Sequence, residues 1–403
     1  MQERAYMILF FTFLIVLLIY FFEKEKRWLW VQVKALSFKL EGLETSQGRL
    51  DASSIIVATQ FQLSASPKIL LLKLDHIGDV VLTIPALRAI RYQWPLAEIT
   101  LVSGPWGKDI LEPEGLIDVF VESLILDRKR FSKREFRNIH NKFSKDMSKN
   151  KYDLAMDLRV FGDTAYLLKH VTASFKIYAR TEHSMFLQGL GVSVPCKLHI
   201  AEQMMFLVKK IGCTAVYEYP CIHLTAHEET FVSQYLTSNV SLKSKLIGFH
   251  PFASVPTRDW GIRNFLKVAE ILIGYGNMEC LFFVGTENLE AIRELPENIR
   301  EKIHIINNTT LRESAALMSA CTVFVGNNSG PMHMAAAVGI PIVSVFSGVE
   351  MAWEWGPATK KSKVINADVP CIRCHQSACS HLTCLKSIPV HTVVTAIHDF
   401  IGS

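Results

Sequence analysis

The chain has 403 residues, enough for two α/β domains, and its 49% hydrophobic and 20% charged residues are typical of a globular protein. A net charge of +5 is small for this length and does not favour a nucleic-acid-binding protein. Nine cysteines without a cleavable signal sequence argue for a reducing compartment and against a disulfide framework.

The first apolar segment lies at the N-terminus. Residues Ala5 to Phe22 carry no charged side chain, and as a helix they would span roughly 27 Å, enough to cross the hydrocarbon core of a bilayer. Lys24, Lys26 and Arg27 follow, and positive charge on this side predicts that the rest of the chain is cytoplasmic. We therefore expect a single-pass anchor in residues 1–22 and a juxtamembrane linker in residues 23–66.

A first α/β domain is predicted for residues 67–240. The run ILLLKL at Ile69–Leu74 is typical of a parallel strand buried on both faces, and DHIGD at Asp75–Asp79 opens a predicted helix. Asp79 suits two roles, a helix cap or a base that accepts a proton from a hydroxyl group. The roles are compatible, because a residue that follows a parallel strand faces the crevice at the carboxyl edge of the sheet.

The segment Asp127–Lys151 is rich in Lys and Arg, and its apolar residues recur at helical spacing. This pattern predicts an amphipathic helix with a basic face. Two interpretations are open: a solvated surface helix, or a face that lies on anionic lipid or holds a phosphorylated acceptor.

A second α/β domain is predicted for residues 241–403. Its first strand, Leu246–His250, leads into a polar loop that carries Arg258, and a guanidinium can bind two phosphate oxygens at once. The strand Cys280–Val284 ends at another polar loop, which begins at Gly285.

The segment Cys321–Gly348 predicts a strand, a loop, a helix and a second strand. Asn327, Asn328 and Ser329 are N-capping residues, and Gly330 and Pro331 lead into an Ala-rich helix. Free backbone N–H groups at such a helix start suit a diphosphate. An ordinary βαβ crossover with a polar loop is the alternative.

Three motifs together resemble glycosyltransferase family 9, the bacterial ADP-heptose:lipopolysaccharide heptosyltransferases. The matching residues are Gly78, Asp79, Pro85, Ala86 and Leu87 in the first motif; Trp260 in the second; and Asn327, Ser329, Gly330, Pro331, Met332, His333, Gly339 and Pro341 in the third. The chain departs from the family pattern at Asn328, where the family usually carries aspartate, and at Arg258, where it carries lysine.

The resemblance implies an α/β protein of GT-B architecture, with two Rossmann-like doubly wound domains facing a cleft. It also implies an inverting, metal-independent transfer from ADP-heptose to a lipopolysaccharide-core or related glycan at the bacterial inner membrane. Asp79 would be the general base, and Arg258 would stabilise the diphosphate leaving group. The implied acceptor contacts are Asp75, His76 and Gly78, and the implied donor contacts are Ser254, Thr257, Trp260, Gly285, Glu287, Glu290, Asn328, Ser329, Gly330, Pro331, Met332 and His333.

The C-terminal tail carries Cys371, Cys374, Cys379 and Cys384. Four thiols this close can bind zinc or an iron–sulfur cluster, but their spacing matches no tight zinc pattern, so we expect no cofactor.

Two rival functions remain. A Rossmann dehydrogenase is disfavoured, because no G-x-G-x-x-G follows any predicted strand. A membrane-tethered scaffold on a catalytically weak or inactive GT-B fold is kept open by Asn328, whereas Asp79 argues against it, since a binding protein has no need of that carboxylate.

Overall fold

The computed structural model describes residues 63–126, 131–184, 187–241, 243–292, 295 and 297–402. The predicted membrane anchor and nearly all of the predicted linker lie outside these ranges. Within the ranges, no helix is both long and apolar enough to cross a membrane.

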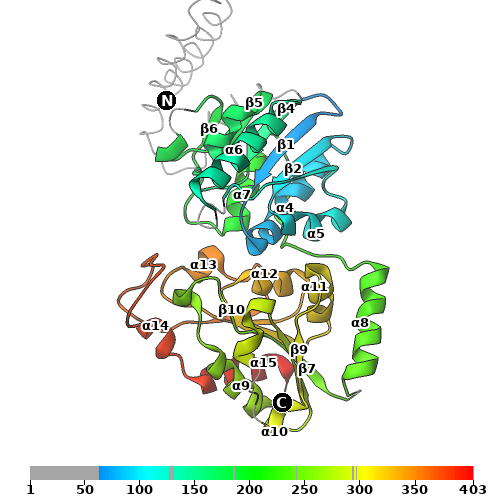
Figure 1. Cartoon of the computed structure of the whole chain (residues 1–403), viewed down its shortest axis with the longest axis vertical. Coiled ribbons are helices and arrows are strands. Elements are labelled where there is room, and N and C mark those ends of the chain that lie inside the picture. Colours follow the sequence, from blue (N-terminus) through cyan, green and yellow to red (C-terminus); the bar gives the residue numbers. More distant parts are fainter. Residues whose placement is uncertain are drawn as a thin grey trace, which may run out of the picture. The chain divides into compact units, whose positions relative to one another are not determined.

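The first half of the described chain forms a six-stranded sheet in the order β3-β2-β1-β4-β5-β6 (Figure 1). Every neighbouring pair is parallel. The strands are β1 (Lys68–Lys73), β2 (Glu98–Ser103), β3 (Val119–Glu122), β4 (Lys151–Asp157), β5 (Thr172–Ala179) and β6 (Leu190–Val192). β1 lies in the middle of the sheet, and all but its first residue are buried, as the apolar run predicts.

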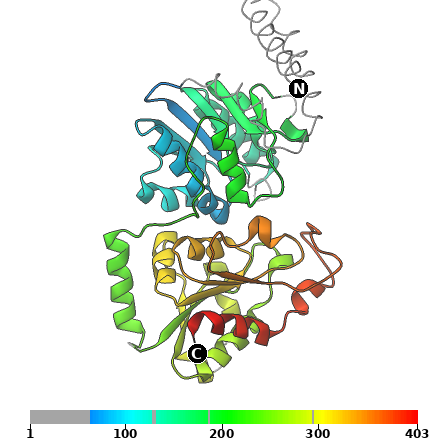
Figure 2. The ribbon, with the colours of Figure 1, turned by 180° about the vertical axis from the view of Figure 1, so that it is seen from behind.

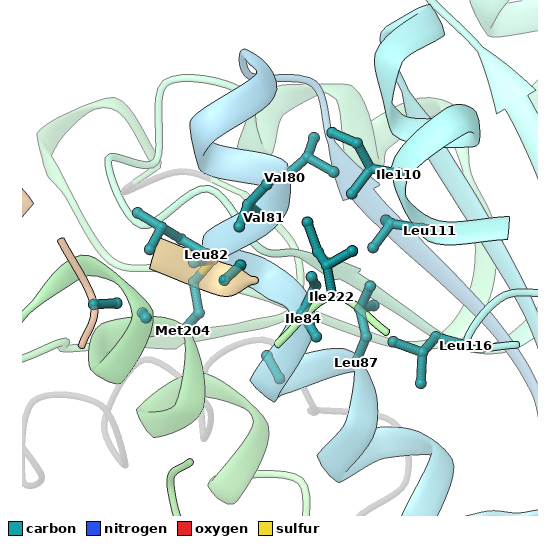
Figure 3. Packing of buried hydrophobic residues seen from close by; sticks show 14 of the residues in the cluster. Val80, Val81, Leu82, Ile84, Leu87, Ile110, Leu111, Leu116, Met204 and Ile222 are labelled. Carbon is teal, nitrogen blue, oxygen red and sulfur yellow. The ribbon is translucent and has the colours of Figure 1, made fainter. Parts of the chain in front are cut away.

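Helix α4 (Ile77–Gln93) fills the core on one face of this sheet, and eleven of its residues are buried. Figure 3 shows Val80, Ile84 and Leu87 of α4 among side chains that α5 (Pro105–Leu111) and α7 (Ile200–Lys209) contribute. On α6 (Lys133–Met147), Phe143 and Met147 are buried in a separate apolar cluster. The apolar side of this predicted basic helix therefore packs within the protein.

The second half repeats the arrangement. Its sheet has the order β12-β11-β10-β7-β8-β9, again with parallel pairs throughout. The strands are β7 (Lys245–His250), β8 (Met278–Phe283), β9 (Ile303–Ile306), β10 (Val323–Asn327), β11 (Ile342–Val345) and β12 (Ser362–Ile365). Helices α8 (Ala226–Asn239), α9 (Ile262–Gly274), α10 (Glu297–Arg300), α11 (Leu311–Ser319), α12 (Gly330–Ala337), α13 (Ala352–Trp355), α14 (Thr383–Lys386) and α15 (Val390–Ile401) accompany it, and Figure 2 shows the C-terminal α15 against this sheet.

Both sheets have the same strand order when each is read along its own chain. In each, the order reverses between the first and the fourth strand, that is, between β1 and β4 and between β7 and β10. Ligands of open α/β sheets bind beyond the carboxyl ends of the strands at such a reversal. The motifs singled out in the sequence follow β1, β7 and β10, which are three of these four strands. The predicted α/β class with two parallel sheets is confirmed.

The interval from Phe175 to Pro195 differs from expectation. Its sequence predicts turns and short pieces, yet it contains most of β5 and all of β6. The first five residues of β5 are exposed or half-exposed, because this strand lies near the edge of the sheet. The continuous apolar run that marks a central strand is therefore missing.

A buried arginine connects elements that are far apart in the sequence. Arg312 of α11 donates from Nε to Glu228 Oε1 of α8 at 2.8 Å and from Nη1 to Glu114 Oε1 at 3.1 Å. Glu114 ends a short 3-10 helix, Glu112–Glu114, and also accepts from Arg88 of α4 at 3.0 Å. The Arg312 cluster, as we call Arg88, Glu114, Glu228 and Arg312, thus joins α4, α8 and α11.

Candidate active site

The starts of α4 and α12 touch where each helix carries a glycine. A Cβ atom at Gly78 would lie 2.7 Å from Cδ2 of His333 and 3.3 Å from Cα of Gly330. A Cβ atom at Gly330 would lie 3.1 Å from Cβ of Ile77. The two motifs that lie furthest apart in the chain are therefore in direct contact, and they meet because neither glycine has a side chain.

We expect Gly78→Ala to separate these helix starts. His333 is buried and cannot easily move, so the added methyl group should destabilise the fold by about 1–3 kcal/mol, as overpacking does, and should lower transfer activity. Thermal unfolding and an activity assay measure the two effects. Gly274→Ala is the matched control, because a Cβ there meets nothing within 4 Å; a loss as large as that of Gly78→Ala in this control would contradict the prediction.

Asp79 lies in the first turn of α4, one residue after the glycine contact. Burial raises the pKa of its carboxyl group above 3.8, while the charge of Lys73 and backbone N–H groups act in the opposite direction. The N-cap of α4 is His76, and its side chain makes no capping hydrogen bond. Asp79 is thus not the N-cap, and its predicted role as a base stays a prediction.

A buried ion network lies beside Asp79 at the carboxyl ends of β1 and β4. Lys73 Nζ is 2.8 Å from Asp75 Oδ2, and Arg159 pairs with the other oxygen of Asp75. Burial, together with the charge of Arg159, lowers the pKa of Lys73 to about 8. Burial raises the pKa of Asp157 to about 7, although Thr164 Oγ1 donates to its carboxylate at 2.7 Å.

This network changes what can be expected of the predicted acceptor contacts. The side chain of Asp75 is only 2% exposed and is held by two cations, so it serves the network and is not open to a glycan. His76 is exposed, with its ring centroid 6.0 Å from that of Trp106. Gly78 contributes the contact with α12. Of the three, His76 is the one whose side chain reaches solvent.

Arg258 lies at the end of a short 3-10 helix, Pro256–Arg258, in the loop after β7. Its Nη2 donates to Oε1 of Glu350, and Nδ2 of Asn328 donates to Oε2 of the same carboxylate at 2.8 Å. Burial raises the pKa of Glu350, against the lowering effects of Arg258 and Asn328. Two residues predicted to bind the donor are thus joined through a third residue that the sequence motifs do not include.

Three polar atoms in this region are buried without a hydrogen-bond partner. They are Nε of Arg258, Oγ1 of Thr257 and Nδ1 of His333. Burial, with the charges of His199 and Arg258, lowers the pKa of His333 to about 3, so its imidazole is neutral at physiological pH. A buried polar group without a partner costs about 1–3 kcal/mol, and a ligand with several acceptor oxygens would remove part of this cost.

The loops after β7 and β10 are fastened to each other. Asn327 accepts from the backbone N–H of Trp260 at 3.1 Å and donates to the carbonyl of Pro251 at 2.9 Å. Ser329 Oγ lies 3.3 Å from Nδ1 of His250, whose pKa burial lowers to about 4. These contacts hold the start of α12 beside Arg258.

The other predicted donor residues divide by exposure. Trp260 and Met332 are buried: the Trp260 ring packs edge-on against Phe265, and Ser344 Oγ donates to the sulfur of Met332 at 2.9 Å. Their side chains therefore support the site from within the core. Exposed or half-exposed are Ser254, Gly285, Glu287, Glu290 and Pro331.

The cysteines of the C-terminal tail, which the structure describes, are neither paired in disulfides nor arranged as a metal site. All nine cysteines are free thiols. In the part of the chain that the structure describes, no group of three or more His, Cys, Asp or Glu side chains is arranged to hold a metal ion.

Sequence reasoning missed Glu350, Lys73 and the role of Thr164. From the sequence, Lys73 is only one residue of a predicted apolar strand, and Glu350 lies in a loop without a motif. The one signal available for Lys73 is a cation inside a run of buried residues, which in a folded protein requires a partner.

Comparison with known proteins identifies the family of this chain. A model of glycosyltransferase family 9 (heptosyltransferase) matches residues 140–384, more than half of the chain. The chain belongs to glycosyltransferase family 9, a family of enzymes that transfer sugars.

Relatives and solved structures show how far the similarity extends. Lipooligosaccharide heptosyltransferase 2 from Campylobacter jejuni is 26% identical over 158 residues, which are 37% of this chain and 49% of that protein. The chain spans about half the length of the first curated relatives it matches.

Solved structures of other proteins share the fold, and two of them illustrate this. A family 9 glycosyltransferase from Veillonella parvula has a TM-score of 0.71 at 22% identity, covering 84% of this chain and 98% of the other. Escherichia coli heptosyltransferase WaaC with ADP-2-deoxy-2-fluoro heptose has a TM-score of 0.64 at 17% identity, covering 82% and 99%. The GT-B-like α/β fold with two parallel sheets is thereby confirmed.

Proposed function

We propose that the chain is an inverting glycosyltransferase that moves heptose from ADP-heptose to a lipopolysaccharide-core or related surface glycan. The observation that carries the proposal is the contact between the starts of α4 and α12 through Gly78 and Gly330. It brings a carboxylate that can act as a base, Asp79, next to a helix start that suits a diphosphate. Family membership and the ADP-sugar complex of the WaaC structure support the choice of donor.

In the proposed reaction, the oxygen of an acceptor hydroxyl group attacks the anomeric carbon of the donor. Asp79 accepts the proton that this hydroxyl group loses. The bond from that carbon to the diphosphate breaks, and negative charge builds on the leaving group. In this proposal, Arg258, the backbone N–H groups at the start of α12 and the neutral His333 stabilise this charge. A guanidinium in this role supplies the positive charge without a metal ion, as we propose for this chain.

We also propose that the enzyme lies at the inner membrane. An anchor in residues 1–22 would hold the catalytic halves at the cytoplasmic face of the inner membrane, where a lipid-linked acceptor is available. The basic side of α6 is a further candidate for contact with anionic lipid.

The test is release of ADP by the full-length chain in detergent, with ADP-heptose as donor and lipopolysaccharide core as acceptor. We expect acceptor-dependent release, and we expect Arg258→Ala to lower kcat by about 10²- to 10³-fold, as removal of one group that stabilises transition-state charge does. Arg258→Lys should recover part of the loss, because it restores the charge without the paired N–H groups.

Three other outcomes are informative. Release from a UDP-sugar instead of ADP-heptose would keep the mechanism and replace the donor. An Arg258→Ala variant as active as the unaltered chain would remove Arg258 from the mechanism. A folded chain that neither binds ADP nor releases it from any donor would favour the scaffold function.

A further inference from the structure

The carboxylate of Glu350 lies between two residues that come from different loops. Its Oε1 accepts from Nη2 of Arg258, in the loop after β7, and its Oε2 accepts from Nδ2 of Asn328 at 2.8 Å, in the loop after β10. Glu350 itself follows β11. Because β7, β10 and β11 are neighbours in the sheet, the Glu350 side chain connects three adjacent loops at the carboxyl ends of these strands.

We propose that Glu350 is a positioning residue for the donor diphosphate, which holds the guanidinium of Arg258 and the amide of Asn328 in the orientation that transfer requires. The inference rests on the proposed function, because it assumes that Arg258 meets the diphosphate. It assigns a role to a residue outside the three sequence motifs.

The geometry of Arg258 is the first argument. A guanidinium has five N–H groups in a fixed plane, so a partner on Nη2 limits where the others point. Nε of Arg258 is buried and has no partner, although the side chain as a whole is 30% exposed. Glu350 thus occupies one end of the guanidinium and leaves an unsatisfied donor for another acceptor.

The identity of residue 328 is the second argument. The Glu350 side chain is 14% exposed, and it makes its two hydrogen bonds to a cation and to an amide. At present the amide of Asn328 donates to the carboxylate of Glu350 at 2.8 Å. An aspartate at position 328 would put a second carboxylate at this distance from Glu350, and the two negative charges would repel each other. The negative charge that the family resemblance leads one to expect at residue 328 is supplied in this chain by residue 350.

An exchange of the two groups tests this assignment. The variants are Glu350→Gln, Asn328→Asp and the double variant that combines them. In the double variant, the glutamine introduced at position 350 can still accept from Arg258 through its carbonyl oxygen. Its amide can donate to the aspartate introduced at position 328. The site then keeps one carboxylate and both hydrogen bonds, with the carboxylate and the amide exchanged.

The assay uses the full-length chain in detergent with ADP-heptose and lipopolysaccharide core, and it measures kcat, the KM for donor and the affinity for ADP. We expect each single variant to lower kcat by about tenfold, within the range of couplings between residues in contact, with a donor KM changed less than about threefold. The double variant should recover kcat to within about threefold of the unaltered chain. Thermal unfolding of all four proteins separates a loss of function from a loss of fold.

The contrary outcomes are distinct. A Glu350→Gln variant with unchanged kcat, or a double variant no better than the worse single variant, overturns the role of Glu350. Recovery of thermal stability without recovery of kcat does so as well, because it shows a contact that is only structural. An unaltered chain that does not bind ADP overturns the proposed function, and this inference with it.

Discussion

Asp79→Asn should lower kcat by about 10²- to 10⁴-fold, which is the contribution that a positioned general base makes. Asparagine preserves the shape of the side chain but cannot accept the proton of the acceptor hydroxyl group. Acceptor-dependent ADP release measures the loss. Asp109→Asn is the matched control, because Asp109 is an exposed carboxylate on α5; it should leave kcat unchanged.

The same variant has a signature in the pH profile. Burial raises the pKa of Asp79 above 3.8, and a base acts only when it is ionised, so kcat/KM should fall as the pH drops through this raised pKa. The decline should begin at a higher pH than an exposed aspartate would give, and it should be absent from the residual activity of Asp79→Asn. An Asp79→Asn variant that retains both its rate and its acid decline would exclude Asp79 as the base.

Arg312→Met should have the largest effect on stability, a loss of about 3–5 kcal/mol in the free energy of unfolding. Methionine fills part of the volume of the arginine but leaves Glu114 and Glu228 without their shared cation. The side chains of these two glutamates are 1% and 8% exposed, so water cannot replace the lost partner. Chemical denaturation measures the loss, and Arg263→Met, at an exposed position on α9, should change stability by less than about 0.5 kcal/mol.

The loss should also depend on pH. Burial acts to raise the pKa of both glutamates, but hydrogen bonds outweigh it and hold both pKa values below 4.5. Glu114 accepts these bonds from His223 and Arg312, and Glu228 accepts them from Arg312 and Thr225. A carboxylate with a lowered pKa adds stability above its unfolded pKa and loses it as the pH falls through the folded value. The difference between Arg312→Met and the unaltered chain should therefore shrink below about pH 4.5. A difference that stays constant would show that the charge of Arg312 is not what stabilises the fold.

Local sequence patterns predicted the parts of this protein that depend on local chemistry. The strand predicted at Ile69–Leu74 is found as β1, Lys68–Lys73, and the helix predicted after the capping residues begins at Gly330, with Ser329 as its N-cap. Gly339, which follows that helix, has φ of 86°, in the left-handed region that glycine favours. Each of these features follows from backbone and burial preferences that operate over a few residues.

The pairs that connect distant segments could not be predicted in this way. Glu350 lies 22 residues from its partner Asn328 and 92 from Arg258, and nothing in the sequence around it indicates either. Arg312 and Glu114 are 198 residues apart. β5 was missed for a related reason, because a strand near an edge buries too few of its side chains to show a continuous apolar pattern.

The Arg312 cluster has a consequence for recombination within the family. The proposed acceptor residues come from the first sheet and the proposed donor residues from the second, so a chimera that exchanges residues 67–240 should change acceptor preference and keep the donor. Such an exchange replaces Arg88, Glu114 and Glu228 while it leaves Arg312 in place. A first half from another family member should therefore pack against this second half only if it has carboxylates at the positions of Glu114 and Glu228 and a glycine at that of Gly78.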